Sequence, residues 1–314
     1  MISVLTFAAV LVWKQGAPKR PRYPIKEWEP LTYVIDYEPY WSPTGREIAL
    51  ISSRHGGLKL HILSLDHNDD GGYKMKQLTF GESEEDSPAW SPDGKLIAFV
   101  SIRKGISEIC TIRPDGTENK QITHGKGNNI HPAWSPDGKR IMFNTTFYDG
   151  ENRKSRKIDS GNPKIGEPQD NFIDLVTTAP DGSAWQRLTK SGGYTYAFYS
   201  PDGKLIVHRR SIGERSQIWV MNVDGTGDHN ISGDNNQDGW PSWGPDSKRI
   251  CFVRRDATGK LNICVMNTNG TGFIQLTDMH GDCSNPRWSP NGKRMLFSRR
   301  DSSTLMTVPA PPPG

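Results

Sequence analysis

The sequence contains six tripeptide steps in which an aromatic residue is followed by Ser or Gly and then Pro. Acidic, aromatic and basic side chains recur at similar places around these steps. Because a planar guanidinium group binds a carboxylate through two parallel hydrogen bonds, such a set could hold a peptide or an anionic sugar. The candidate binding residues are Asp36, Glu85, Asp86, His131, Tyr194, Tyr196, Arg209, Asp238, Trp240, Arg254, Asp282 and Arg299. The same charges could instead form salt bridges between neighbouring repeats, and both interpretations remain open.

The sequence contains no motif of an established catalytic centre. The nucleophile motif G-x-S-x-G and the zinc motif H-E-x-x-H do not occur, and the eight histidines lack the spacing of metal ligands. Segment 234–239 has oxygen-bearing side chains at positions 1, 3 and 5 of a calcium loop and Gly at position 6. Position 12 is Pro245 in place of a bidentate Glu, which favours a solvated turn. We therefore expect no catalytic residue and no cofactor, with calcium or manganese as the less favoured alternative.

The elements that must position these side chains form a repeat. The aromatic–Ser/Gly–Pro steps begin at Trp41, Trp90, Trp134, Tyr199, Trp243 and Trp288. Their prolines are separated by 49, 44, 65, 44 and 45 residues. A repeat of roughly 40–45 residues that is built from short strands is typical of one four-stranded propeller blade.

The second copy shows the order of strands and turns within a blade. Apolar or alternating runs at 88–90, 96–100, 108–112 and 120–123 predict four short strands, which we call a to d in chain order. The turns at 91–95 and 114–117 both carry Pro-Asp-Gly: Pro presets φ, Asp caps the turn, and Gly takes the conformation with φ above zero. The recurrence of these elements predicts antiparallel strands joined by tight turns.

Six copies predict an all-β protein, a six-bladed β-propeller of four-stranded antiparallel blades. The last copy ends after its strand c at residue 308, while residues 30–32 match the end of a strand d. An N-terminal strand is therefore expected to complete the last blade and close the ring, which protects the sheet edges. The predicted organisation is an apolar leader and linker (1–26), a single propeller (27–308) and a Pro-rich tail (309–314).

The connections of propeller blades fall on two opposite faces. Short turns between strands a and b and between strands c and d share one face, and the other loops lie on what we call the loop face. Residues 147–172 form a polar insertion between strands b and c of the third copy and account for the 65-residue interval. Because long loops on a rigid scaffold usually carry function, the predicted binding surface is the channel mouth on the loop face.

Charge and hydropathy restrict the partners and the location of the chain. The 39 basic and 35 acidic residues are interspersed, with a net charge of +4, so nucleic-acid binding is not expected. No apolar run reaches about 18 residues, which argues against a transmembrane helix. Residues 1–13 have the length of a signal-peptide apolar region, although no Lys or Arg precedes them; an uncleaved anchor or a disordered leader is the alternative. We expect a periplasmic or secreted monomer.

The four cysteines, Cys110, Cys251, Cys264 and Cys283, lack the spacing of a zinc site. Cys251 and Cys264 would face each other across one hairpin if its loop is symmetric, and a disulfide there would be strained. Buried thiols that act as small apolar side chains are the favoured interpretation.

The segment PAWSPDGKLIAFVS at 88–101 and its five relatives resemble the WD40-like (PD40-type) repeat of TolB-like propellers. The resemblance covers about residues 30–308 and implies a six-bladed propeller. Within this family, TolB is periplasmic and binds the peptidoglycan-associated lipoprotein, whereas oligogalacturonate lyases are enzymes. About thirty residues precede the first repeat, too few for the N-terminal α/β domain that TolB carries.

The function that this resemblance implies is a non-enzymatic scaffold in the cell envelope that binds a protein or peptide, for instance an envelope lipoprotein. The alternative is a polysaccharide lyase of the oligogalacturonate type, or a hydrolase, that uses the arginines of the channel face and a metal. Whether the chain is an enzyme stays open, with the binding scaffold favoured.

Overall fold

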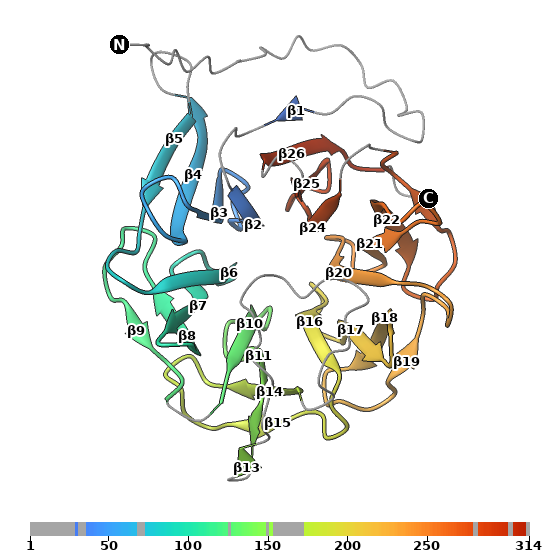
Figure 1. Cartoon of the computed structure of the whole chain (residues 1–314), viewed down its shortest axis with the longest axis horizontal. Helices are drawn as coiled ribbons and strands as arrows, with labels where there is room; N and C mark the ends of the chain where they lie inside the picture. Colours follow the sequence, from blue (N-terminus) through green and yellow to red (C-terminus); the bar gives the residue numbers. More distant parts are fainter. Residues whose placement is uncertain are drawn as a thin grey trace.

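The computed structural model describes residues 29–30, 36–67, 73–124, 127–148, 151–152, 173–278, 282–300 and 304–311. Within these residues, six four-stranded antiparallel sheets stand around a central channel as the blades of a propeller (Figure 1). The all-β class, the number of blades and the four strands per blade that the repeats predict are therefore confirmed.

The strands of the first three blades follow one another in chain order from the channel outward (Figure 1). Blade 1 contains β2 (Asp36–Trp41), β3 (Glu47–Ser52), β4 (Lys59–His67) and β5 (Tyr73–Gln77). Blade 2 contains β6 (Glu84–Trp90), β7 (Ile97–Arg103), β8 (Ile106–Ile112) and β9 (Lys120–Gln121). Blade 3 contains β10 (Asn129–Trp134), β11 (Ile141–Thr145), β14 (Asp174–Thr178) and β15 (Gln186–Arg187).

The other three blades repeat this order, except that the outermost strand of blade 6 comes from the N-terminal side of the chain. Blade 4 contains β16 (Tyr194–Tyr199), β17 (Leu205–Ile212), β18 (Arg215–Asn222) and β19 (His229–Asn230). Blade 5 contains β20 (Asp238–Trp243), β21 (Arg249–Arg255), β22 (Leu261–Asn267) and β23 (Ile274–Gln275). Blade 6 contains β24 (Cys283–Trp288), β25 (Arg294–Arg299), β26 (Thr304–Pro309) and β1 (Glu29–Pro30).

The predicted insertion of blade 3 begins with a small hairpin, β12 (Phe147–Tyr148) paired with β13 (Glu151–Asn152). The rest of the insertion, the predicted leader at 1–26 and the last three residues of the Pro-rich tail lie outside the described residues. Among the described segments, no helix has the length and apolarity needed to cross a membrane.

The Ser-Pro-Asp-Gly turn after the innermost strand is stabilised by its serine. In blade 2, Ser91 Oγ donates a hydrogen bond to Asp93 Oδ1 at 2.7 Å and accepts one from the Leu96 backbone N–H at 2.9 Å. Gly94 has a φ of 71°, the left-handed conformation that glycine adopts without steric cost. The motif that marks the repeat is therefore explained by turn geometry and needs no ligand.

The apolar core is divided among the six seams between neighbouring blades. Each of six clusters of buried side chains combines residues from adjacent blades, and the cluster between blades 5 and 6 also includes Tyr196 of blade 4. Between blades 1 and 2, for example, Leu60 packs in one cluster with Trp90 and Phe99. Across the next seam, Trp134 Nε1 donates to the carbonyl oxygen of Ala89 at 3.1 Å. The aromatic residue of each repeat thus joins its blade to the preceding one.

The first and last blades meet in a seam of the same kind. Trp41 lies in one buried cluster with Leu296 and Leu305 of blade 6. In addition, β1 pairs antiparallel with β26, and Glu29 lies opposite Thr307 (Figure 1). Residues 31–32, which the sequence assigns to this outermost strand, lie outside the described residues.

The predicted register of Cys251 and Cys264 is wrong by one residue. Cys251 lies opposite Val265, and Cys264 lies opposite Phe252. Because successive side chains of a strand point to opposite faces, this offset sends the two thiols into different seams. All four cysteines are buried as thiols, and burial raises the pKa of Cys251 and of Cys264 to about 12.

Candidate functional site

Six side chains, one from each blade, form what we call the channel ring. They lie three positions before the aromatic residue of the repeat and are Glu38, Ser87, His131, Tyr196, Trp240 and Asn285. All six have a positive φ, between 48° and 52°, which non-glycine residues rarely adopt. Each sits where the register of the innermost strand shifts against its neighbour, as in a β-bulge. Since bulges re-aim side chains and such strain gathers at functional sites, the ring is the candidate site.

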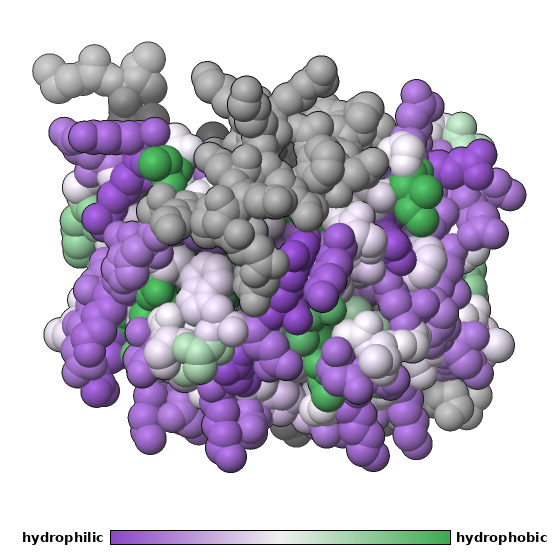
Figure 2. Space-filling model, turned by 90° about the horizontal axis from the view of Figure 1, so that it is seen from below, coloured by the Kyte–Doolittle hydropathy of each residue, from purple (hydrophilic) through white to green (hydrophobic). Residues whose placement is uncertain are grey.

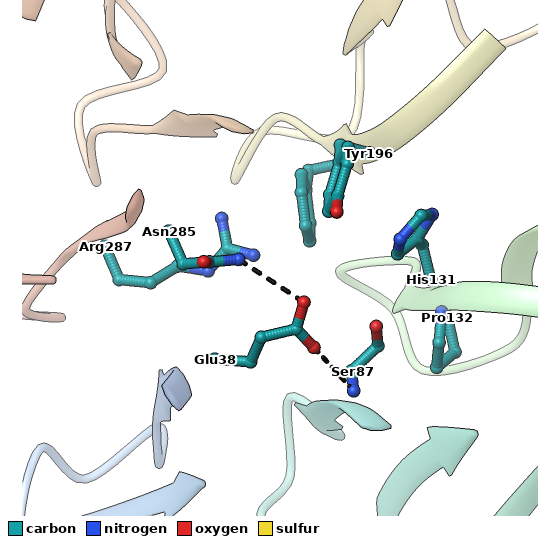
Figure 3. Close-up of a pocket in the computed structure, with 8 residues that line it drawn as sticks. Glu38, Ser87, His131, Pro132, Tyr196, Asn285 and Arg287 are labelled. Atoms are coloured by element: carbon teal, nitrogen blue, oxygen red, sulfur yellow. Dashed lines mark hydrogen bonds between the residues drawn. The ribbon is translucent and has the colours of Figure 1, made fainter. Parts of the chain in front are cut away.

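A pocket lies within the channel. It is lined by Glu38, Ser87, His131, Pro132, Tyr196, Phe198, Asn285 and Arg287 (Figure 3). Figure 3 shows that these side chains come from several blades and point toward one another around the carboxylate of Glu38. The pocket therefore belongs to the closed ring and to no single blade.

Two carboxyl groups from neighbouring blades meet at one backbone N–H group. The N–H of Ser87 donates to Glu38 Oε2 at 2.6 Å (Figure 3) and to Asp86 Oδ1 at 2.8 Å. Burial raises the pKa of Asp86 well above its usual value, and the negative charge of Glu38 raises it further. Asp86 therefore retains its proton to a higher pH than an isolated carboxyl group does.

Aromatic rings form the opposite part of the channel ring. The imidazole of His131 lies 3.9 Å from the Tyr196 ring, centroid to centroid, and Tyr196 lies 5.9 Å from Trp240. Burial lowers the pKa of His131 to about 4, so the imidazole is neutral at pH 7. Its Nδ1 lies 3.3 Å from Asn144 Oδ1, which fixes the ring as a hydrogen-bond donor at that nitrogen.

Arg287 brings a positive charge to the pocket. Its guanidinium group lies 4.1 Å from the Phe198 ring and 5.3 Å from the Tyr40 ring. Nη1 donates to the carbonyl oxygen of Pro241 at 3.4 Å, and no hydrogen-bond partner of Nε occurs among the described residues. The aromatic rings thus hold the guanidinium group in place while leaving part of its donor capacity unused.

The structure brings three of the predicted binding residues into or beside this pocket. His131 and Tyr196 line it, and Asp86 lies beside it through the contact with Ser87. Trp240 belongs to the channel ring and packs near Tyr196. Arg209 is fully buried in β17, opposite Thr195.

Most of the other predicted residues lie in local ion pairs or hydrogen bonds away from the pocket. Asp36 accepts from Arg54 at 2.8 Å, and Asp238 accepts from Arg254 through two hydrogen bonds of 2.8 Å. Glu85 lies 3.5 Å from Lys59 of the preceding blade. The remaining placements are Tyr194 beside Asp228, Asp282 accepting from the Leu261 N–H at 3.1 Å, and Arg299 at the end of β25 opposite Cys283.

The calcium-like segment 234–239 does not fit a cation. Both carboxylate oxygens of Asp238 are bonded to Arg254, and Asp234 Oδ1 accepts from Asn230 Nδ2 at 2.8 Å. Across the part of the chain that the structure describes, no group of three or more His, Cys, Asp and Glu side chains is arranged to hold a metal ion.

Sequence reasoning misses Glu38, Ser87, Asn285 and Arg287 of the pocket. The signal for the first three is positional, because every ring residue lies three places before the aromatic residue of its repeat. In five of the six repeats, Pro directly follows the ring residue. These prolines are Pro39, Pro88, Pro132, Pro241 and Pro286. Residue type gives no such signal, since the six ring residues are all different.

Tyr194 takes part in a separate polar cluster within blade 4. Asp228 accepts hydrogen bonds from His208 Nε2 at 2.8 Å, from Arg210 Nη1 at 2.9 Å and from the Tyr194 hydroxyl at 3.0 Å. Burial alone would raise the pKa of Asp228, but these donors hold it below its usual value. We interpret this cluster as one that stabilises the fold.

Asp228→Asn is expected to lower the free energy of unfolding by about 2 kcal/mol at pH 7, because it removes the charge that three donors share. A carboxyl group with a depressed pKa contributes stability above its ordinary pKa and loses that contribution as the pH falls through the folded-state pKa. The difference between the variant and the wild type should therefore shrink below about pH 4. Urea unfolding at pH 7, 5 and 3 measures it, and a gap independent of pH would contradict the role of the charge.

The fold and the ring together define a closed six-bladed propeller with a polar, aromatic-lined channel pocket. The sequence matches the family described as the TolB beta propeller domain over residues 33–184 and 169–310. The chain therefore belongs to the TolB beta propeller family, as its repeat motif suggests. Comparison with curated proteins gave no match.

Solved structures with the same fold include proteins of different function. The putative TolB from Agrobacterium tumefaciens is 24% identical with a TM-score of 0.68, and the match covers 89% of this chain and 92% of that one. TolB from Acinetobacter baumannii is 21% identical with a TM-score of 0.61, covering 90% of this chain and 65% of that one. An oligogalacturonate lyase from Vibrio parahaemolyticus is 12% identical with a TM-score of 0.58, covering 89% and 92%. At these identities the likeness shows the fold alone.

Proposed function

We propose that this chain is a non-enzymatic binding propeller of the cell envelope that receives a segment of a protein or peptide in its channel. The observation that carries the proposal is the channel ring, in which six residues with a positive φ carry different side chains and five of them line one pocket. Left-handed backbone at a non-glycine residue costs on the order of 1–3 kcal/mol, so six equivalent sites favour a role beyond packing. The TolB proteins among the structural neighbours support a scaffold that works outside the cytoplasm.

The outer surface of the propeller is a weaker candidate for the binding surface. The side seen in Figure 2 is mainly hydrophilic, with separate hydrophobic spots and no continuous apolar patch outside the grey atoms. The large exposed apolar residues are spread over several blades; they include Phe80, Ile106, Ile212 and Phe273. Scattered apolar residues of this kind are ordinary on a soluble surface.

The proposal predicts that filling the pocket abolishes partner capture. Ser87 lines the pocket and would keep its backbone N–H in Ser87→Tyr, so the bulky ring should occupy the pocket while the contact with Glu38 remains. Asn119→Tyr is the matched control, because Asn119 is exposed beyond β8. Quantitative mass spectrometry of envelope proteins retained by each immobilised variant is the measurement. We expect at least a tenfold loss of the retained partner with Ser87→Tyr only; equal recovery would refute a channel site.

A polysaccharide lyase is the second candidate, because oligogalacturonate lyases, one of them described in complex with manganese, share the fold. Its weakness is the lack of a converging set of metal ligands among the described residues. Ultraviolet absorbance of unsaturated products, measured with oligogalacturonate and Mn²⁺, distinguishes the two candidates. Product formed by the wild type and lost in His131→Ala would replace the binding proposal with the lyase.

A further inference from the structure

Arg209 is a fully buried cation whose hydrogen-bonding capacity is largely unused. Its only hydrogen bond among the described residues runs from Nη2 to Ser211 Oγ at 3.5 Å, while Nε and Nη1 have no partner there. Thr195, directly opposite in the sheet, also has a buried hydroxyl without a partner in the described chain. Unpaired buried charge is costly, so an unpaired guanidinium group calls for an explanation.

Arg287 is a second guanidinium group with an unsatisfied donor, and it lines the pocket. Both arginines act on the same pocket residue, since the positive charges of Arg209 and Arg287 each help to lower the pKa of His131 after the larger effect of burial. The two cations therefore belong to one electrostatic environment: Arg287 lines the pocket, whereas Arg209 is fully buried in β17 opposite Thr195.

The nearby carboxyl groups do not neutralise these cations by direct pairing. Glu38 and Asp86 both bind the Ser87 N–H, and no hydrogen bond or ion pair between either of them and Arg209 or Arg287 occurs in the described residues. When Asp86 is protonated, two positive charges face one negative charge. One further anion would balance the site.

We propose that the channel pocket binds a carboxylate, with Arg287 as the direct contact and Arg209 as a buried source of positive potential. This inference rests on the proposed function for the placement of the ligand in the channel. The Arg287 guanidinium group lies 4.1 Å from the Phe198 ring, lines the pocket and has an Nε without a partner among the described residues, and its planar fork favours bidentate binding of a carboxylate. The carboxylate belongs to an acidic side chain or to the C-terminus of a bound polypeptide.

Sodium acetate is the first probe. Thermal unfolding at constant ionic strength is compared for the wild type, Arg287→Gln and Arg103→Gln, the last being an exposed arginine at the end of β7 with the same change of charge. We expect acetate to raise the melting temperature of the wild type and of Arg103→Gln by about 2–4 °C in a saturable manner. Arg287→Gln should lose the saturable rise. An equal response in all three proteins, or saturation by chloride instead of acetate, would overturn the proposal.

Arg287→Lys is a second variant in case Arg287→Gln does not fold. It keeps the positive charge but lacks the planar guanidinium group, so at least tenfold weaker acetate binding is expected. Two short peptides then separate the sources of the carboxylate: an amidated peptide with one internal Asp and an acid-free peptide with a free C-terminus. Saturable binding of one peptide only identifies the source, and binding of neither peptide refutes a polypeptide ligand. If the anion proposal alone is wrong, Ser87→Tyr still abolishes partner capture while Arg287→Gln leaves it unchanged.

Discussion

Gly225→Ala is expected to lower the free energy of unfolding by about 3–5 kcal/mol, which combines a backbone term with a steric one. Gly225 has a φ of 86°, a conformation that side chains oppose. A Cβ atom there would lie 2.6 Å from the carbonyl oxygen of Leu188 in the preceding blade, closer than real Cβ contacts. The backbone carbonyl cannot rotate away as a side chain could, so the two blades would have to separate. Denaturant unfolding measures the loss.

Gly105→Ala is the matched control. Gly105 has a φ of 77°, but a Cβ atom there would meet nothing within 4 Å. Only the backbone term applies, so we expect a loss of about 1–2 kcal/mol. Equal losses for the two variants would show that conformational strain alone determines the cost and that the contact between blades is loose.

This glycine shows why the repeat could be recognised from the sequence. Gly270 stands in the same relation to the carbonyl oxygen of Ile231, 2.6 Å from a would-be Cβ, as Gly225 does to Leu188. The turn residue is thus dictated twice, by its own φ and by the neighbouring blade. Contacts that recur at several seams select the same residue type in several copies, and this repetition makes the number of blades and the order of strands predictable.

The candidate site could not be predicted in the same way, because its residues share a backbone conformation and not a chemical type. Glu38, His131 and Trp240 occupy equivalent positions with φ values of 50°, 52° and 48°. No sequence pattern used to predict strands distinguishes a bulge of this kind from a regular strand, so the inward turn of these side chains stays hidden. Its traces in the sequence are the fixed distance of three positions to the aromatic residue and, at five of the six positions, a following Pro.

The ion-pair partners of charged residues could not be predicted from the sequence either. Asp36 and Asp238 both lie at the start of an innermost strand, where a ring of acids around the channel mouth is a reasonable expectation. Both are fully buried, and each pairs with an arginine of its own blade, Arg54 or Arg254. Long arginine side chains reach several neighbours, and which of them they choose depends on burial and packing that the spacing does not contain.

Trp41→Ala is expected to lower the free energy of unfolding by about 3–5 kcal/mol and to open the ring at one seam. Trp41 is 8% exposed, packs with Leu296 and Leu305 of the last blade, and donates from Nε1 to the Arg287 carbonyl oxygen at 3.4 Å. The chain of blade 1 is joined to blade 6 only through the two-residue strand β1 among the described residues, so their seam depends on side-chain packing and on the pairing of β1 with β26. Hydrogen exchange should therefore become faster in β2 and β25 than in the strands of blade 3.

Trp134→Ala separates seam opening from general destabilisation. Trp134 is also 8% exposed and occupies the equivalent position between blades 2 and 3, whose strands are consecutive in the chain. A similar loss of unfolding free energy is expected, but with exchange accelerated evenly over the ring, because the chain itself limits separation at that seam. If both variants accelerate exchange evenly, the closing seam is as strongly held as the others. Since the channel pocket contains Glu38 of blade 1 and Arg287 of blade 6, an opened seam should also abolish binding in the channel.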